Sequence, residues 1–200
     1  MSNKKKFISL LKKTKRYGID YLIEWLEINE FFTAPCSTQH HLCREGGLLE
    51  HSLNVYECMN RLANCLLGRE QTDDIANSII ICSLLHDVGK VGQFGKPYYV
   101  ENYLSKTDKD GNPVRSTAKP YITNAELLNV PHEIRSLSII DRHIDLTEQE
   151  QFAILYHNGM YGDLKYQLNG KETPLYLLLH TADMWCSRII EVEKEEQQPE

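Results

Sequence analysis

The chain has 200 residues, of which 42% are hydrophobic and 25% are charged, and its formal net charge is −6. These values are near the averages of globular domains, so they argue against a disordered chain and against a membrane protein, and the length suits one domain over residues 1–200. The negative net charge also argues against a protein that reads the grooves of DNA.

The first 30 residues have the pattern of two helices, and the segment from Lys4 to Arg16 is strongly basic. Apolar residues recur at helical spacing, and Gly18 separates two segments, Phe7 to Leu11 and Tyr21 to Leu26. We therefore expect a basic helical extension over residues 1–30, beside a core that runs from about residue 40 to residue 190. The apolar stretch after the first lysines is too short for a signal peptide, so we expect no export and a cytoplasmic protein.

Two further helices are expected in the middle of the chain. After a loop that ends at Gly46-Gly47, an apolar stripe from Leu48 to Leu67 indicates an amphipathic helix. Thr72 or Asp73 is a suitable N-cap for the next helix, whose apolar residues indicate burial on most sides. This helix should end at His86-Asp87, next to a glycine.

The region from Val91 to Tyr121 departs from helical periodicity. Its tyrosines and Val100 precede Asp110-Gly111-Asn112-Pro113, a strong turn signal. We expect a small β-hairpin insertion around residues 97–121, beside an otherwise all-α fold.

Three more helices are indicated by their start and stop signals. One follows Pro131, and a second is opened by a capping box of Thr147 with Glu150 and stopped near Asn158-Gly159. Thr173-Pro174 starts the last long helix. Residues 191–200 then form an acidic tail.

The six cysteines show no paired C-x-x-C spacing, so reduced thiols in the cytosol are expected. One group, Cys36, His40, His41 and Cys43, contains possible zinc ligands. Its C-x3-H-H-x-C spacing matches no common structural zinc arrangement, and we expect a plain loop that borders the functional site.

His86 and Asp87 are neighbours at the end of a buried helix, where both side chains can point into a bundle and bind a divalent cation. Such a pair alone is weak evidence. Four other residues strengthen it, because each belongs to a different expected helix and a bundle can bring them together: His51, His132, His157 and Asp183.

In this order the residues resemble the HD superfamily of metal-dependent phosphohydrolases, whose pattern is H…HD…D. Gly46 to Leu53 is similar to the G-G-L-L-x-H-[ST]-L opening of bacterial HD domains found beside exoribonucleases and relaxases. Leu84 to Lys90 is similar to their L-L-H-D-[LIV]-G-K. The resemblance spans about His40 to Arg188 and implies an HD-domain helical bundle.

The resemblance also implies the metal ligands. His51, His86, Asp87 and Asp183 would hold a first metal, and members with two metals add two histidines, here His132 and His157, with Asp87 bridging the ions. His143 is an alternative to His132, and His180 is a candidate for a partner of a ligand rather than a ligand. The cofactor would be one or, as we favour, two divalent ions, from among manganese, iron, nickel, magnesium and zinc.

The positive charge of the metal ions and of nearby basic residues suggests a mechanism of phosphoester hydrolysis. A metal pair can activate a water and stabilise a displacement at phosphorus, with Asp87 and Lys90 as catalytic residues. Lys90 and Arg44 would bind the phosphate, and Lys96 is a weaker candidate. We expect hydrolysis of a phosphoester in a nucleotide or at a nucleic-acid end, with a small-molecule phosphoester or a single strand as partner and no membrane.

Three alternatives remain at this point. The first is a 5′-nucleotidase-like enzyme with a single metal, and the second is an HD-type di-iron oxygenase. The third is a non-catalytic module that binds a nucleotide or a protein. The sequence does not indicate an oligomeric state.

Overall fold

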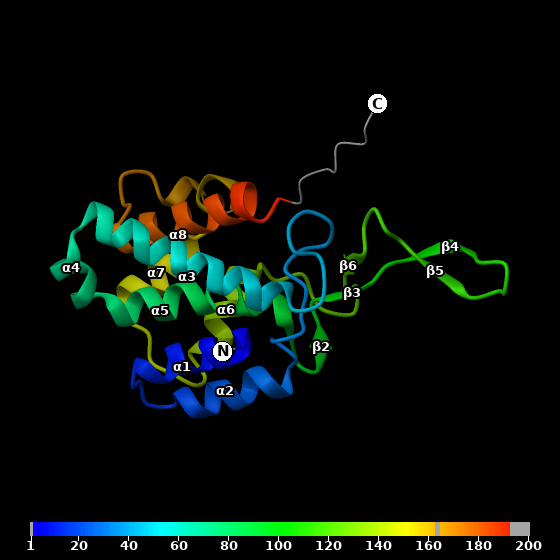
Figure 1. Ribbon diagram of the computed structural model, residues 1–200, viewed down its shortest axis with the longest axis horizontal. Helices are drawn as coiled ribbons and strands as arrows, with labels where there is room; N and C mark the ends of the chain where they lie inside the picture. Colours follow the sequence, from blue (N-terminus) through cyan, green and yellow to red (C-terminus); the bar gives the residue numbers. More distant parts are fainter. Residues whose placement is uncertain (1, 163–164, 193–200) are drawn as a thin grey trace.

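The computed structural model describes residues 2–162 and 165–192, and within them the chain is mostly helical, as expected (Figure 1). The expected acidic tail lies outside the described residues from residue 193 onward. The α-helices of the described part are α1 Asn3–Lys13, α2 Ile19–Ile28, α3 Gly47–Leu66, α4 Arg69–Asp74, α5 Ala76–Leu85, α6 His132–Ile140, α7 Glu148–Tyr156 and α8 Pro174–Trp185.

Side-chain caps explain where the later helices begin. The capping box of α7 is present: the Thr147 side chain accepts from the Glu150 backbone, and the Glu150 side chain accepts from the Thr147 backbone. At the start of α8 the Thr173 side chain accepts from the Tyr176 backbone, and Pro174 is the first helical residue. Both start signals expected from the sequence are confirmed.

The helix start expected at Thr72 or Asp73 is wrong. The short helix α4 contains both residues, and the buried Thr72 hydroxyl donates to the carbonyl of Gly68 one turn back. A separate helix, α5, begins after Ile75, whose backbone leaves the helical region. A threonine that bonds within its own helix cannot serve as the N-cap of the next one.

Helices α3, α5, α7 and α8 pack on one another around a single hydrophobic core. Helix α1 lies against α3 and α5 and adds Phe7 and Leu11, both fully buried. The N-terminal segment is therefore part of the core and not only an extension beside it.

Short antiparallel strands separate α5 from α6, and the expected hairpin is present. Its strands, β4 Tyr103–Thr107 and β5 Pro113–Arg115, project from the helical body (Figure 1). Asp108 holds the turn, because its carboxylate accepts from the backbone of Asp110 and Asn112. The strands pair as β1 Gly92–Gln93 with β2 Lys96–Pro97, β3 Tyr99–Glu101 with β6 Tyr121–Thr123, and β4 Tyr103–Thr107 with β5 Pro113–Arg115.

None of the described helices combines the length and the apolar character that crossing a membrane requires.

Candidate metal centre

Two glycines fix the start of α3 and thereby place His51. Gly46 has φ +73°, a conformation that favours glycine, and a Cβ on Gly47 would lie 2.0 Å from the carbonyl oxygen of Leu42. The loop before the helix can therefore fold tightly over its first turn. His51, in the second turn of α3, is fully buried.

A third glycine brings α6 to the end of α5. His86 and Asp87 follow α5 directly, and the 3-10 turn η1, Val88–Val91, comes next. A Cβ on Gly89 would lie 2.1 Å from the carbonyl oxygen of His132, and the Gly89 amide donates to the Ser136 hydroxyl at 2.9 Å. This close approach sets His132, the first residue of α6, beside Asp87.

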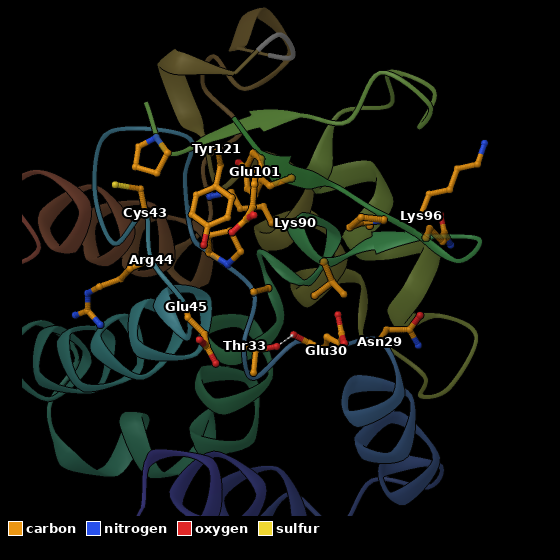
Figure 2. Close-up of a pocket in the computed structure, with 18 of the residues that line it drawn as sticks. Asn29, Glu30, Thr33, Cys43, Arg44, Glu45, Lys90, Lys96, Glu101 and Tyr121 are labelled. Carbon is orange, nitrogen blue, oxygen red and sulfur yellow. Dashed lines mark hydrogen bonds between the residues drawn. The ribbon is translucent and has the colours of Figure 1, made fainter. Parts of the chain in front are cut away.

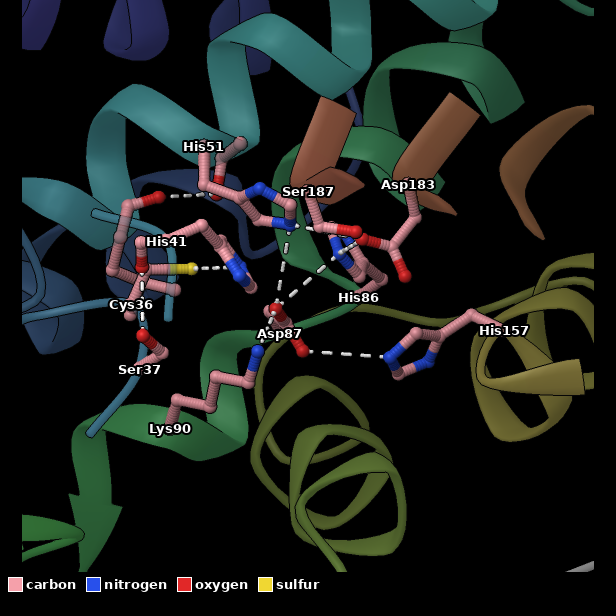
Figure 3. Close-up of polar contacts among 12 residues, drawn as sticks. Cys36, Ser37, His41, His51, His86, Asp87, Lys90, His157, Asp183 and Ser187 are labelled. Carbon is pink, nitrogen blue, oxygen red and sulfur yellow. Dashed lines mark hydrogen bonds and ion pairs between the residues drawn. The ribbon is translucent and has the colours of Figure 1, made fainter. Parts of the chain in front are cut away.

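The six expected ligands meet in one centre, and Figure 3 shows five of them, His51, His86, Asp87, His157 and Asp183. They fall into two groups according to the oxygen of Asp87 that each pair of histidines faces. In the first group, His51 Nε2 lies 3.1 Å from Asp183 Oδ1 and 3.6 Å from Asp87 Oδ2. His86 Nε2 lies 3.5 Å from Asp87 Oδ2 and 4.0 Å from Asp183 Oδ1.

The second group uses the other oxygen of the same carboxylate. Asp87 Oδ1 lies 3.1 Å from His132 Nε2 and 3.4 Å from His157 Nε2. The two histidine nitrogens are 3.3 Å apart. Two donors that each bind one ion at about 2.1 Å are separated by roughly 3.0–3.5 Å, so these spacings suit ligands of a common ion.

Backbone contacts fix which ring nitrogen faces the centre. Nδ1 of His86 donates to the carbonyl of Ser83 at 3.0 Å, and Nδ1 of His157 donates to the carbonyl of Ile154 at 2.7 Å. A carbonyl oxygen only accepts, so Nδ1 carries the hydrogen and Nε2 keeps its lone pair for a metal.

Three buried atoms of the centre have no hydrogen-bond partner among the described residues, namely His51 Nε2, His86 Nε2 and Asp87 Oδ1. Leaving a buried polar atom without a partner costs about 1–3 kcal/mol, so a folded protein rarely keeps three together. Divalent ions would satisfy all three atoms, and the donor set therefore fits metal binding.

A further buried residue that contacts the centre, Glu191, was not expected from the sequence. Residues 191–200 were expected to form an acidic tail, but Glu191 is buried and follows a π-helical turn, Cys186–Ile190. Its carboxylate accepts from His51 Nδ1 at 2.9 Å and from the Asn54 amide at 2.9 Å. The prediction is corrected for this residue: Glu191 orients a candidate ligand.

Burial and charge act in opposite directions on the titration of the centre. Burial alone would lower the pKa of His51, but Cys36 and the neighbouring carboxylates of Asp183 and Glu191 hold it well above its usual range. For His86 burial dominates and lowers the pKa to about 4. Burial would raise the pKa of Asp87, yet Lys90 and the surrounding histidines hold it well below its usual range.

Lys90 connects the centre to a cavity of about 780 Å³ (Figure 2). Its Nζ lies 2.6 Å from Asp87 Oδ2, and its side chain is 13% exposed. Burial would lower the pKa of Lys90, but Asp87 raises it well above its usual range, so the ammonium stays charged. Arg44 and Lys96 line the same cavity, where Arg44 pairs with Glu50 and Lys96 donates to the carbonyl of Glu126.

Three other histidines take different places. The ring of His143 donates to the carbonyl of Ile139 and packs on Trp25, so His143 does not replace His132. His180 donates to the carbonyl of His157 at 2.7 Å and supports the backbone of that ligand. His41 lies beside His51, with the two ring centroids 5.2 Å apart.

The fold separates the four residues of the possible zinc cluster, so that only two of them lie beside the centre. Cys36 Sγ lies 3.4 Å from His41 Nε2, next to the centre. His40 is exposed, and Cys43 lines the cavity. Burial raises the pKa of the Cys36 thiol to about 11 and lowers the pKa of His41 to about 4.

Comparison with known proteins adds no assignment, because no family model, no curated protein and no solved structure matches the chain.

Proposed function

We propose that the chain is an HD-domain phosphohydrolase that uses divalent metals to hydrolyse a phosphoester of a nucleotide or of a nucleic-acid end. The observation that supports this function is the pair of ligand groups that share Asp87, one through Oδ2 and the other through Oδ1. The order of the ligands along the chain also agrees with the H…HD…H…H…D pattern of two-metal HD domains.

Two ions would be held, the first by His51, His86, Asp87 and Asp183, and the second by Asp87, His132 and His157. Imidazole and carboxylate together favour manganese, iron, nickel or zinc over magnesium. When bound, such ions lower the pKa of a coordinated water and stabilise charge on phosphate oxygens.

The protein's own groups hold and orient the reacting parts. The backbone carbonyls that accept from His86 and His157 keep these rings in one tautomer and one orientation. The charged Lys90 lies between Asp87 and the cavity and would bind a non-bridging phosphate oxygen. Arg44 and Lys96 lie on the cavity wall and would contact more distant parts of a substrate.

The size of the cavity supports a nucleotide-sized substrate. A volume of about 780 Å³ is within the usual range of small-molecule sites, roughly 300–1,000 Å³. All six cysteines are free thiols, which supports a reducing, cytosolic location.

The test is a screen of the purified full chain, loaded in turn with manganese, iron, nickel and magnesium, against nucleotides, cyclic nucleotides and short single strands. We expect hydrolysis of at least one substrate with at least one metal, monitored by chromatography of the products, and none by Asp87→Asn. Asp141→Asn, in the exposed end of α6, is the matched control and should keep the wild-type rate.

Failure of every metal and substrate pair to give turnover would count against a hydrolase. Oxygen consumption by the iron-loaded protein would instead favour the di-iron oxygenase. Turnover with a single bound equivalent would favour the mononuclear nucleotidase.

A further inference from the structure

A tight loop over residues 36–42 presents a cysteine and a histidine to the metal centre (Figure 3). The Cys36 amide donates to the carbonyl of Leu42 at 3.1 Å, and the Ser37 hydroxyl donates to the carbonyl of His41 at 2.7 Å. These two bonds close the loop and turn the side chains of Cys36 and His41 toward His51.

The spacing of these side chains suits a metal. A tetrahedral zinc ion binds sulfur at about 2.3 Å and nitrogen at about 2.1 Å, which separates the two donors by roughly 3.5 Å. Cys36 Sγ and His41 Nε2 are 3.4 Å apart. Together with a ring nitrogen of His51, these ligand atoms lie within 4.8 Å of one another.

The donor set is also softer than that of the main centre. The main centre offers imidazole and carboxylate, whereas this cluster adds a thiol that is completely buried. A thiolate with imidazoles selects zinc and cadmium over manganese or magnesium. The two sets of ligands would therefore differ in the ions that they prefer.

His51 belongs to both sets, and a single nitrogen of its ring cannot serve both. Its Nδ1 is engaged by Glu191 and its Nε2 lies 3.1 Å from Asp183. Each ring nitrogen has one lone pair at most, so a nitrogen that binds one ion is lost to another. An ion that draws His51 onto Cys36 and His41 would break one of its two contacts in the main centre.

We propose that Cys36, His41 and His51 form a separate site for one thiophilic divalent cation of the zinc and cadmium class, and that filling this site inactivates the main centre by engaging His51. The binding itself is independent of the proposed function. Only the inhibition rests on the proposed function.

The binding is tested by titrating the metal-free full chain with Cd²⁺ and following the ultraviolet absorbance of the cadmium–thiolate bond. We expect one tight equivalent that is lost in Cys36→Ser. Cys43→Ser is the matched control, because it removes a thiol seven residues along that is outside the cluster, and it should retain the signal. An unchanged titration of Cys36→Ser would overturn the site.

A second pair of variants tests the site independently, in case Cys36→Ser does not fold. His41 is half-buried and His40 is its exposed neighbour, so His41→Gln and His40→Gln are both tolerable in the loop. We expect His41→Gln to weaken cadmium binding by at least about 10-fold. Removing a residue that only hydrogen-bonds to a metal ligand already lowers metal affinity by about 10- to 100-fold, and His41 would be a ligand itself. Equal affinities in the two variants would contradict the role of His41.

Inhibition is measured on the manganese-loaded protein with bis(4-nitrophenyl) phosphate as the probe, as the ratio of rates with and without one equivalent of Cd²⁺. The ratio should fall in the wild type and in Cys43→Ser and stay near one in Cys36→Ser. Equal inhibition in Cys36→Ser would overturn the competition for His51. No hydrolysis in any protein would count against the proposed function, while the cadmium spectra still decide whether the site exists.

Discussion

Replacement of Gly89 by alanine should remove the second metal without unfolding the protein. The new Cβ would lie 2.1 Å from the carbonyl oxygen of His132, and 2.9 Å from the Ser136 amide. Ordinary contact begins near 3.4 Å, so α6 must move away from η1 by roughly 1 Å. Overpacking of this kind costs about 1–3 kcal/mol in the free energy of unfolding.

The effect on the centre is larger than the effect on stability. His132 Nε2 lies 3.1 Å from Asp87 Oδ1, and metal sites tolerate deviations of only about 0.2 Å in their bond lengths. A misplacement of about 1 Å can cost 10²-fold in activity. We therefore expect Gly89→Ala to retain about one equivalent of Mn²⁺ in calorimetric titration, where the wild type binds two.

Gly111→Ala is the matched control. It adds the same atom in the turn of the β4–β5 hairpin, where nothing lies within 4 Å, but at φ +84°, which costs about 1–2 kcal/mol of local strain. Both variants should lose comparable thermal stability, and only Gly89→Ala should lose metal. Two equivalents bound by Gly89→Ala with wild-type affinity would refute the reasoning.

Four further predictions concern single side chains. His157→Ala should keep about one equivalent of metal by elemental analysis while its activity falls much further, because one ion cannot stabilise both the entering and the leaving oxygen. Lys90→Ala should lower phosphoester turnover by about 10- to 1000-fold with unchanged metal content, unless the lysine only neutralises Asp87. Glu191→Gln should weaken Mn²⁺ binding by about 10- to 100-fold relative to the exposed control Glu172→Gln, because the carboxylate no longer supports His51. Because the pKa of His51 is raised, both of its ring nitrogens carry a hydrogen in the metal-free protein at neutral pH. Metal binding must release one of these protons, so the affinity for Mn²⁺ should rise with pH, and calorimetry in two buffers should count the proton released.

Local sequence signals predicted the positions of most residues of the centre. His86, Asp87 and His157 come directly after helices whose ends are visible as glycine stops, and His51 follows a glycine pair. Each signal fixes where a helix begins or ends and hence which residue lies at its end. These signals, together with the resemblance to the HD superfamily, explain why the six residues could be grouped before their distances were known.

The remaining parts of the site depend on contacts between distant segments. Glu191 reaches His51 only because a π-helical turn follows α8, and hydrophobic periodicity contains no signal for that turn. Cys36 and His41 meet because their loop closes on itself, a geometry that ligand spacing alone does not indicate. The choice between His132 and His143 likewise required the packing of α6 on η1.

The division between α4 and α5 is another feature that the sequence did not predict. Residues 69–85 contain no glycine or proline that marks a break at Ile75, so the sequence predicts a single helix that starts at Thr72 or Asp73. The hydroxyl of Thr72 bonds back to Gly68 instead of capping forward. Such competition between a side chain and the backbone is decided by the surrounding packing, not by residue type.

The ligands of the centre come from α3, from α6, from α8 and from the residues that end α5 and α7, so bound metal would tie together most of the helical body. Ions that bind only the folded chain stabilise it by about 2.7 kcal/mol when their free concentration is 100 times Kd. The amount of folded protein would then follow the supply of metal in its surroundings. A cell short of that metal would lose molecules of this protein to degradation as well as losing the turnover of those that remain.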